Sequence, residues 1–241
     1  MSLRRTLRKC TQLITLGSLK SRLASTWPCD FDFVDAQFED RPAPGVANVF
    51  PPPYFVWHQS RTPSEVSLVH DYIRQIVMDG EPYDGVIGFS EGAALAAALL
   101  LTDAARESHG SKPMFRYAVF FNAVNVLSPS EELGKDVAEV EMQKALEIFD
   151  MEAYSQGDCS IHRVRIMSSD ALSAAITIPT LHVVGLRDDF RGFARDLIRQ
   201  CTLSNTRVVE LPIGHEVPRG RAMEEVALQI EEALLMVSLA A

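Results

Sequence analysis

The chain has 241 residues, of which 47% are hydrophobic and 23% charged, and its formal net charge is −9. This length and balance suit one soluble domain with a sizeable core. The acidic balance argues against nucleic acid as the main partner, because phosphate binding needs a basic surface. The longest apolar run, Ala93 to Leu101, is too short to cross a bilayer, so we expect no membrane span.

The amino-terminal segment differs from the rest of the chain in charge. Residues 1–29 contain six basic side chains and no acidic one. Such a segment is typical of a mitochondrial transit peptide. We favour instead a frayed, disordered start over residues 1–15, followed by an amphipathic helix. We therefore expect a cytoplasmic protein, with the mitochondrion as the alternative location.

Cysteine usage and motifs give no indication of a metal site. The four cysteines are scattered without a C-x-x-C pair, which predicts free thiols in a reducing compartment; they are Cys10, Cys29, Cys159 and Cys201. No metal-binding or nucleotide-binding motif occurs, so we expect no cofactor.

Hydrophobic periodicity predicts strands and helices in alternation. Apolar and acidic residues alternate at 31–35, which indicates a short strand, and the prolines of the loop 41–53 exclude helix and interior strand there. Ser64 can cap a following helix that ends at Gly80. The later predicted elements are strand 83–89, helix 93–101, strand 115–121, helix 136–149, strand 178–184, helix 190–201, strand 206–211 and helix 219–237.

This alternation implies an α/β fold with a mainly parallel sheet and helices on both faces. We expect residues 1–241 to form a single domain. Residues 123–177 interrupt the alternation directly after a core strand. They form either a lid that covers the substrate or a surface excursion with one packed helix.

The segment Gly88-Phe89-Ser90-Glu91-Gly92 matches the G-x-S-x-G pattern of a nucleophile elbow. In this motif a sharp strand-to-helix turn exposes the serine hydroxyl, and the glycines avoid collisions with the neighbouring strand and helix. The turn also aims the backbone N–H of the next residue, Glu91, at a developing oxyanion. A buried strand before the motif and an Ala/Leu-rich helix after it are the setting that this interpretation requires.

A nucleophilic serine needs an imidazole base, and that base needs an acid to orient it. In α/β-hydrolases the chain order is serine, acid, histidine. Asp188 and Asp189 follow one predicted strand, and His215 follows the next. Loops at the carboxyl ends of parallel strands meet at one edge of the sheet. We therefore predict Ser90, His215 and Asp188 as the catalytic residues, with Asp189 as the alternative acid.

Five segments carry a resemblance to a known family: YDGVIGFSEGAALAAALL, IPTLHVVGLRDDF, the tail Gly214-His215-Glu216-Val217-Pro218, the Pro-rich PAPGVANVFPPPYFVW and the SEVSLVHDYIRQIV that follows it. They resemble the FSH-type serine hydrolases, which include fungal LovG-type esterases and thioesterases of polyketide pathways. The resemblance implies an α/β-hydrolase with the triad Ser90, Asp188 and His215. It also implies cleavage of an ester or thioester. The acyl substrate would be a small molecule or be bound to a carrier protein, with a polyketide synthase as a partner. The acid of that group usually lies three residues after the glycine, which supports Asp188.

The chain departs from this family at its start. Members normally begin with an apolar strand and a His-Gly loop that supplies a second oxyanion N–H. Residues 12–17 resemble such a strand, but they run directly into a predicted helix at 18–24 without His-Gly. Loss of one oxyanion donor costs roughly 10²–10³ in rate. The missing loop therefore leaves a hydrolase-like binding protein without activity as one alternative, and a general carboxylesterase of small esters is the alternative among enzymes.

Overall fold

A computed structural model describes residues 13–26, 30–42, 46–48, 51–80, 82–106, 113–136, 164–170 and 172–239. Its centre is a four-stranded parallel sheet in the order β3-β4-β7-β8. These strands are β3 (Gly85–Phe89), β4 (Tyr117–Phe121), β7 (Thr180–Gly185) and β8 (Thr206–Leu211). Every residue of β7 is buried, as expected for an inner strand of a parallel sheet.

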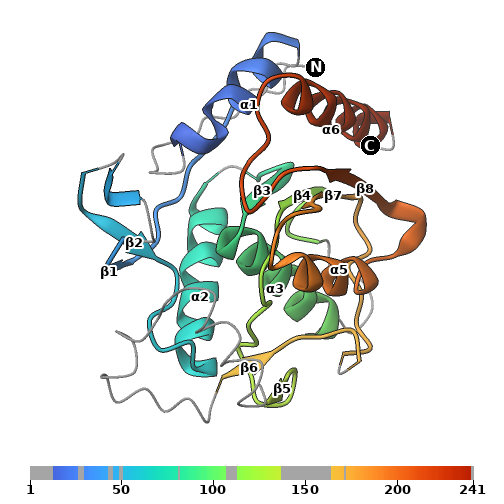
Figure 1. Ribbon diagram of the computed structural model, residues 1–241. Helices are drawn as coiled ribbons and strands as arrows, with labels where there is room; N and C mark the ends of the chain where they lie inside the picture. Colours follow the sequence, from blue (N-terminus) through green and yellow to red (C-terminus); the bar gives the residue numbers. More distant parts are fainter. Residues whose placement is uncertain are drawn as a thin grey trace.

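Helices cover both faces of this sheet (Figure 1). Successive side chains of β4 point to opposite faces. Val119 and Phe121 pack with α1 (Leu13–Thr26) and α6 (Arg221–Leu239), whereas Phe120 packs with α3 (Glu91–Arg106) and α5 (Arg191–Arg199). The α/β prediction with helices on both faces is confirmed.

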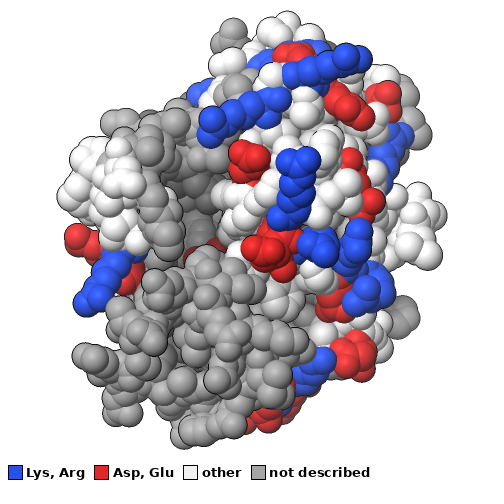
Figure 2. Space-filling view, viewed as in Figure 1, with Lys and Arg blue, Asp and Glu red and all other residues white. Residues whose placement is uncertain are grey.

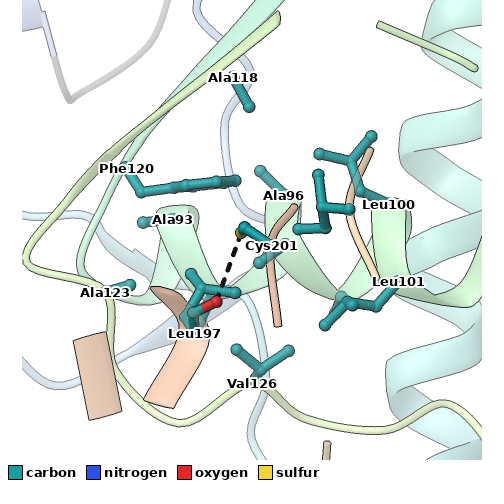
Figure 3. Packing of buried hydrophobic residues seen from close by; sticks show 14 of the residues in the cluster. Ala93, Ala96, Leu100, Leu101, Ala118, Phe120, Ala123, Val126, Leu197 and Cys201 are labelled. Atoms are coloured by element: carbon teal, nitrogen blue, oxygen red, sulfur yellow. Dashed lines mark hydrogen bonds between the residues drawn. The ribbon is translucent and has the colours of Figure 1, made fainter. Parts of the chain in front are cut away.

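Small side chains on α3 allow it to lie close to the sheet. Ala93 and Ala96 surround the ring of Phe120, and the thiol of Cys201 lies beside them (Figure 3). On its other side α3 contacts α2 (Pro63–Asp79) through an apolar cluster that includes Val69 and Leu99. The helix that carries the predicted nucleophile at its start is thus fixed from two sides.

The predicted helix after the Pro-rich loop is present, but its cap differs from the prediction. The N-cap of α2 is Thr62, whose hydroxyl accepts the N–H of Glu65 at 3.4 Å, and Ser64 lies inside the helix. The Glu65 carboxylate in turn accepts the N–H of Arg61 at 2.7 Å. Because proline is favoured at the first helical position, the helix starts at Pro63, two residues earlier than a cap at Ser64 would place it.

Two predictions for the amino-terminal region are wrong. Residues 13–17, expected as part of a strand, belong to helix α1, in which Leu19 and Leu23 are buried against α6. A short apolar run does not distinguish strand from helix, and here packing on α6 decides. Residues 31–35 are not a strand either. The antiparallel pair β1 (Phe38–Asp40) and β2 (Tyr54–Val56) flanks the Pro-rich loop instead, with a 3₁₀ turn at Val46–Asn48.

The segment 123–177 is described only at its two ends. There β5 (Lys135–Asp136) pairs antiparallel with β6 (Arg165–Ile166). Asp136, the first residue of the predicted helix 136–149, lies in β5, and the rest of that helix lies outside the described residues. So do residues 1–12, where the transit-peptide prediction mainly falls. A further 3₁₀ turn, η4 (Leu203–Asn205), precedes β8.

Charged side chains of both signs are interspersed on the face of the molecule shown in Figure 2. Several exposed arginines pair with acids, among them Arg195 with Glu210 at 2.9 Å and Arg207 with Glu232 at 2.7 Å. None of the helices in the described part of the chain is both long and apolar enough to span a membrane.

Candidate active site

Ser90 lies at the sharp turn between β3 and α3. Its φ is +55°, a left-handed conformation that is uncommon for a residue other than glycine. A Cβ on Gly88 would lie 2.5 Å from both Cα and N of Ala93, so only glycine permits this close approach of strand and helix. The Ser90 N–H donates to the carbonyl of Phe121 at 2.9 Å. The G-x-S-x-G segment therefore has the strand–turn–helix geometry that its sequence predicts.

His215 lies in the loop that follows β8. Its Nε2 is 2.8 Å from Oγ of Ser90, and its Nδ1 is 2.9 Å from Oδ2 of Asp188. The imidazole also contacts two aromatic rings, those of Phe89 at 5.2 Å and Phe190 at 5.1 Å between centroids. These contacts limit rotation of the ring and direct its two nitrogens at the serine and the aspartate.

Asp188 lies in the loop after β7 and is 1% exposed. One carboxylate oxygen faces His215, and the other accepts the N–H of Phe190 at 2.8 Å. Asp189 is exposed to solvent. Of the two aspartates that the sequence leaves open, Asp188 is the one that the structure places on His215.

Asn122 is a buried polar residue that the sequence analysis did not single out. It follows β4 directly, has φ of +45° and is 0% exposed. Its Oδ1 accepts the N–H of Gly185 at 2.7 Å, and its Nδ2 donates to the carbonyl of Glu216 at 2.8 Å. An asparagine at the carboxyl end of a buried strand was the available signal in the sequence.

Glu91, the residue directly after Ser90, also makes contacts through its side chain. The carboxylate accepts the N–H of Trp57 at 3.3 Å and lies 3.4 Å from Nδ1 of His58. Burial acts to raise the pKa of Glu91, but the hydrogen bond and charge of His58, together with the charge of Arg61 and the N–H of Trp57, lower it overall. His58 is 4% exposed and had no predicted role.

The model of the serine hydrolase (FSH1) family matches residues 6–226 of this chain. The chain belongs to the serine hydrolase (FSH1) family. It is 22% identical to Esterase FPY3 of Fusarium mangiferae over 90% of this chain and 88% of that protein. It is 31% identical to Esterase alnB of Emericella nidulans over 108 residues, which are 45% of this chain and 37% of that protein.

The fold of this serine hydrolase (FSH1) member also occurs in a solved bacterial structure. A lipase-esterase related protein from Clostridium acetobutylicum superposes with a TM-score of 0.50 at 15% identity, over 94% of this chain and 91% of that one. At this identity the likeness concerns the fold alone. It agrees with the predicted α/β-hydrolase architecture.

Other titratable groups of this serine hydrolase are buried on the α3 side of the sheet. The thiol of Cys201 lies 3.5 Å from Nε2 of His182 and donates to the carbonyl of Leu197 (Figure 3). Burial raises the pKa of Cys201 to about 12 and lowers the pKa of His182 to about 4. Both groups are therefore neutral near pH 7. Within the described ranges, no three histidine, cysteine or acidic side chains cluster so as to hold a metal ion.

Proposed function

We propose that this protein hydrolyses an ester or thioester with Ser90 as nucleophile, His215 as base and Asp188 as the orienting acid. The observation that carries the proposal is the unbroken line of contacts from Ser90 Oγ through His215 to Asp188, at 2.8 Å and 2.9 Å. The strained turn at Ser90 supports it, because strained backbone is concentrated at functional sites.

In the first half of the reaction, His215 Nε2 takes the proton of the Ser90 hydroxyl as Oγ attacks the acyl carbonyl. Asp188 accepts the Nδ1–H of the imidazolium and fixes its orientation. His215 then gives the proton to the leaving alcohol or thiol, and an acyl-serine remains. In the second half, His215 removes a proton from water, the resulting hydroxide attacks the acyl carbon, and the acid leaves as Ser90 recovers its proton.

The negative charge on the carbonyl oxygen needs hydrogen-bond donors during both halves. The backbone N–H of Glu91 is the donor that we assign, since Glu91 follows Ser90 and begins α3. The positive end of the α3 dipole adds to this stabilisation. The contacts of the Glu91 carboxylate with Trp57 and His58 hold this residue in place.

For the substrate class, we propose a polyketide-type acyl product, released from or trimmed on a carrier protein of a polyketide synthase. The resemblance of the segments around Ser90 and Asp188 to fungal polyketide-pathway esterases and thioesterases supports this choice. The esterase names of the two fungal relatives agree with ester cleavage. A cytoplasmic location fits such a partner.

The test compares purified wild type with Ser90→Ala on matched panels of p-nitrophenyl esters and acyl-carrier thioesters. We expect the wild type to cleave acyl-carrier thioesters and the variant to fall to background on both panels. Rapid cleavage of simple esters together with inert carrier thioesters would favour a general carboxylesterase. No turnover by folded wild type on either panel would favour a binding protein without activity.

A further inference from the structure

The carboxyl end of β4 contacts all three loops that carry Ser90, Asp188 and His215. The carbonyl of Phe121 accepts the Ser90 N–H at 2.9 Å. The next residue, Asn122, donates its own N–H to the carbonyl of Val183 in β7 at 2.9 Å. Its side chain reaches the two remaining loops. This two-residue unit therefore joins the turn at Ser90 to the loops that follow β7 and β8.

The side chain of Asn122 makes opposite kinds of hydrogen bond with the two loops. Oδ1 accepts the N–H of Gly185 at 2.7 Å, at the start of the Asp188 loop. Nδ2 donates to the carbonyl of Glu216 at 2.8 Å and lies 3.4 Å from that of Gly214, so it contacts the residues on both sides of His215. A planar amide side chain supplies an acceptor on one atom and a donor on the other, as these two hydrogen bonds require.

The local backbone shows that this arrangement is held against a conformational cost. Asn122 has φ of +45°, where residues other than glycine are disfavoured and asparagine is among those best tolerated. It is 0% exposed, and hydrogen bonds in such a site are strengthened by the low local dielectric. The left-handed turn directs the amide across the carboxyl ends of β7 and β8.

From this geometry we infer that Asn122 is a positioning residue of the triad, which sets the place of His215 relative to Ser90 and Asp188. The inference rests on the proposed function. Asn122 acts through His215 and does not itself touch the reacting atoms. A displacement of about 1 Å in a catalytic group is enough to cost about 10²-fold in rate.

The informative variant is Asn122→Asp, which keeps the acceptor for Gly185 N–H and removes the donor to the His215 loop. Asn205→Asp is the matched control, because the Asn205 amide also donates to a backbone carbonyl, that of Thr177, at the opposite end of the sheet. Each variant is assayed on a p-nitrophenyl ester, and turnover is expressed per site titrated with a fluorophosphonate. We expect kcat of Asn122→Asp to fall about 10- to 100-fold with KM within about twofold, and the control to keep wild-type values.

A purely structural role predicts a different result. Asn122→Asp would then lose titratable sites while each remaining site kept wild-type turnover, and that outcome would overturn the inference. If Asn122→Asp does not fold, Asn122→Gly removes the amide while permitting the positive φ, and the same kcat and KM split is expected of it.

A double-mutant cycle tests whether the effect passes through His215. In the His215→Ala background there is no imidazole to position, so Asn122→Asp should change the residual rate by less than about twofold. An equal loss in both backgrounds would contradict the inference and leave the proposed function intact. If the wild type itself neither turns over nor reacts with the fluorophosphonate, the proposed function has failed instead.

Discussion

The carboxylate of Glu91 lies 3.4 Å from Nδ1 of His58, a buried residue 33 positions earlier in the chain. The same carboxylate accepts the N–H of Trp57. Glu91 is also the residue whose backbone N–H we assign to the oxyanion. Its side-chain contacts therefore anchor the start of α3 to the turn that follows β2.

If this anchoring matters for catalysis, truncation of the side chain should lower turnover. We expect Glu91→Ala to reduce kcat about tenfold through a displaced N–H, and Glu91→Gln to lose less because it can still accept from Trp57. Steady-state kinetics on a p-nitrophenyl ester measure both, with the exposed Glu225→Gln as the control. Unchanged kcat in Glu91→Ala would show that the backbone of the elbow needs no such support.

The two neighbouring aspartates provide a matched pair of variants. Asp188→Asn should lower kcat by about 10³- to 10⁴-fold, because the amide no longer favours the imidazole tautomer that can accept the serine proton. Asp189→Asn should stay within about twofold of wild type, since Asp189 is exposed. A large loss in Asp189→Asn with little loss in Asp188→Asn would reverse the assignment.

Two glycines differ in what a methyl group would meet. A Cβ on Gly88 would lie 2.5 Å from backbone atoms of Ala93 and from the carbonyl of Gly92, whereas nothing lies within 4 Å of one on Gly192. Gly88→Ala should lower the free energy of unfolding by about 1–3 kcal/mol or more, and Gly192→Ala should leave it unchanged or slightly higher. Urea unfolding measures both. Equal stabilities would mean that strand and helix do not approach this closely.

Acid should destabilise the fold through its buried histidines. Burial lowers the pKa of His182 to about 4, below its ordinary value of 6.5, so the unfolded chain binds the proton more readily than the folded one. The contribution of neutral His182 to the free energy of unfolding is therefore fully present above pH 6.5. It is lost as the pH falls towards 4, by up to about 3 kcal/mol.

His182→Leu removes that proton uptake. Its free energy of unfolding should depend less steeply on pH between 6.5 and 4 than that of the wild type, with parallel curves above pH 7. His70, whose pKa burial lowers to about 3, contributes in the same sense and remains in the variant. Identical slopes for the two proteins would show that His182 is not buried in the neutral form.

The central sheet and the sharp turn at Ser90 could be predicted because their signals are local. Apolar runs indicate buried strands, and the glycine positions in G-x-S-x-G predict the sharp turn directly. The acid and the base follow from the meeting of strand ends at one sheet edge. The sequence favoured Asp188 but left Asp189 open, because adjacent residues in a loop differ only in direction, and the contact of Asp188 with His215 decides between them.

The misassigned segments are short and depend on tertiary contacts. Residues 13–17 have no decisive period of their own, and their helix is fixed by packing on α6. The position of Asn122 after a buried strand was visible in the sequence, but its hydrogen bonds, like the contact of His58 with Glu91, join residues more than 30 positions apart. Long-range hydrogen bonds of this kind leave no pattern in a single sequence.

The most direct test of the central claim is the mass of the intact protein after reaction with a fluorophosphonate. Attack by an activated Ser90 forms an Oγ–P bond and releases fluoride, so one adduct per chain is expected. The adduct should map to the peptide that contains Ser90 and be absent from Ser90→Ala. An unmodified wild type that is shown to be folded, or an adduct that persists in Ser90→Ala, would contradict the account.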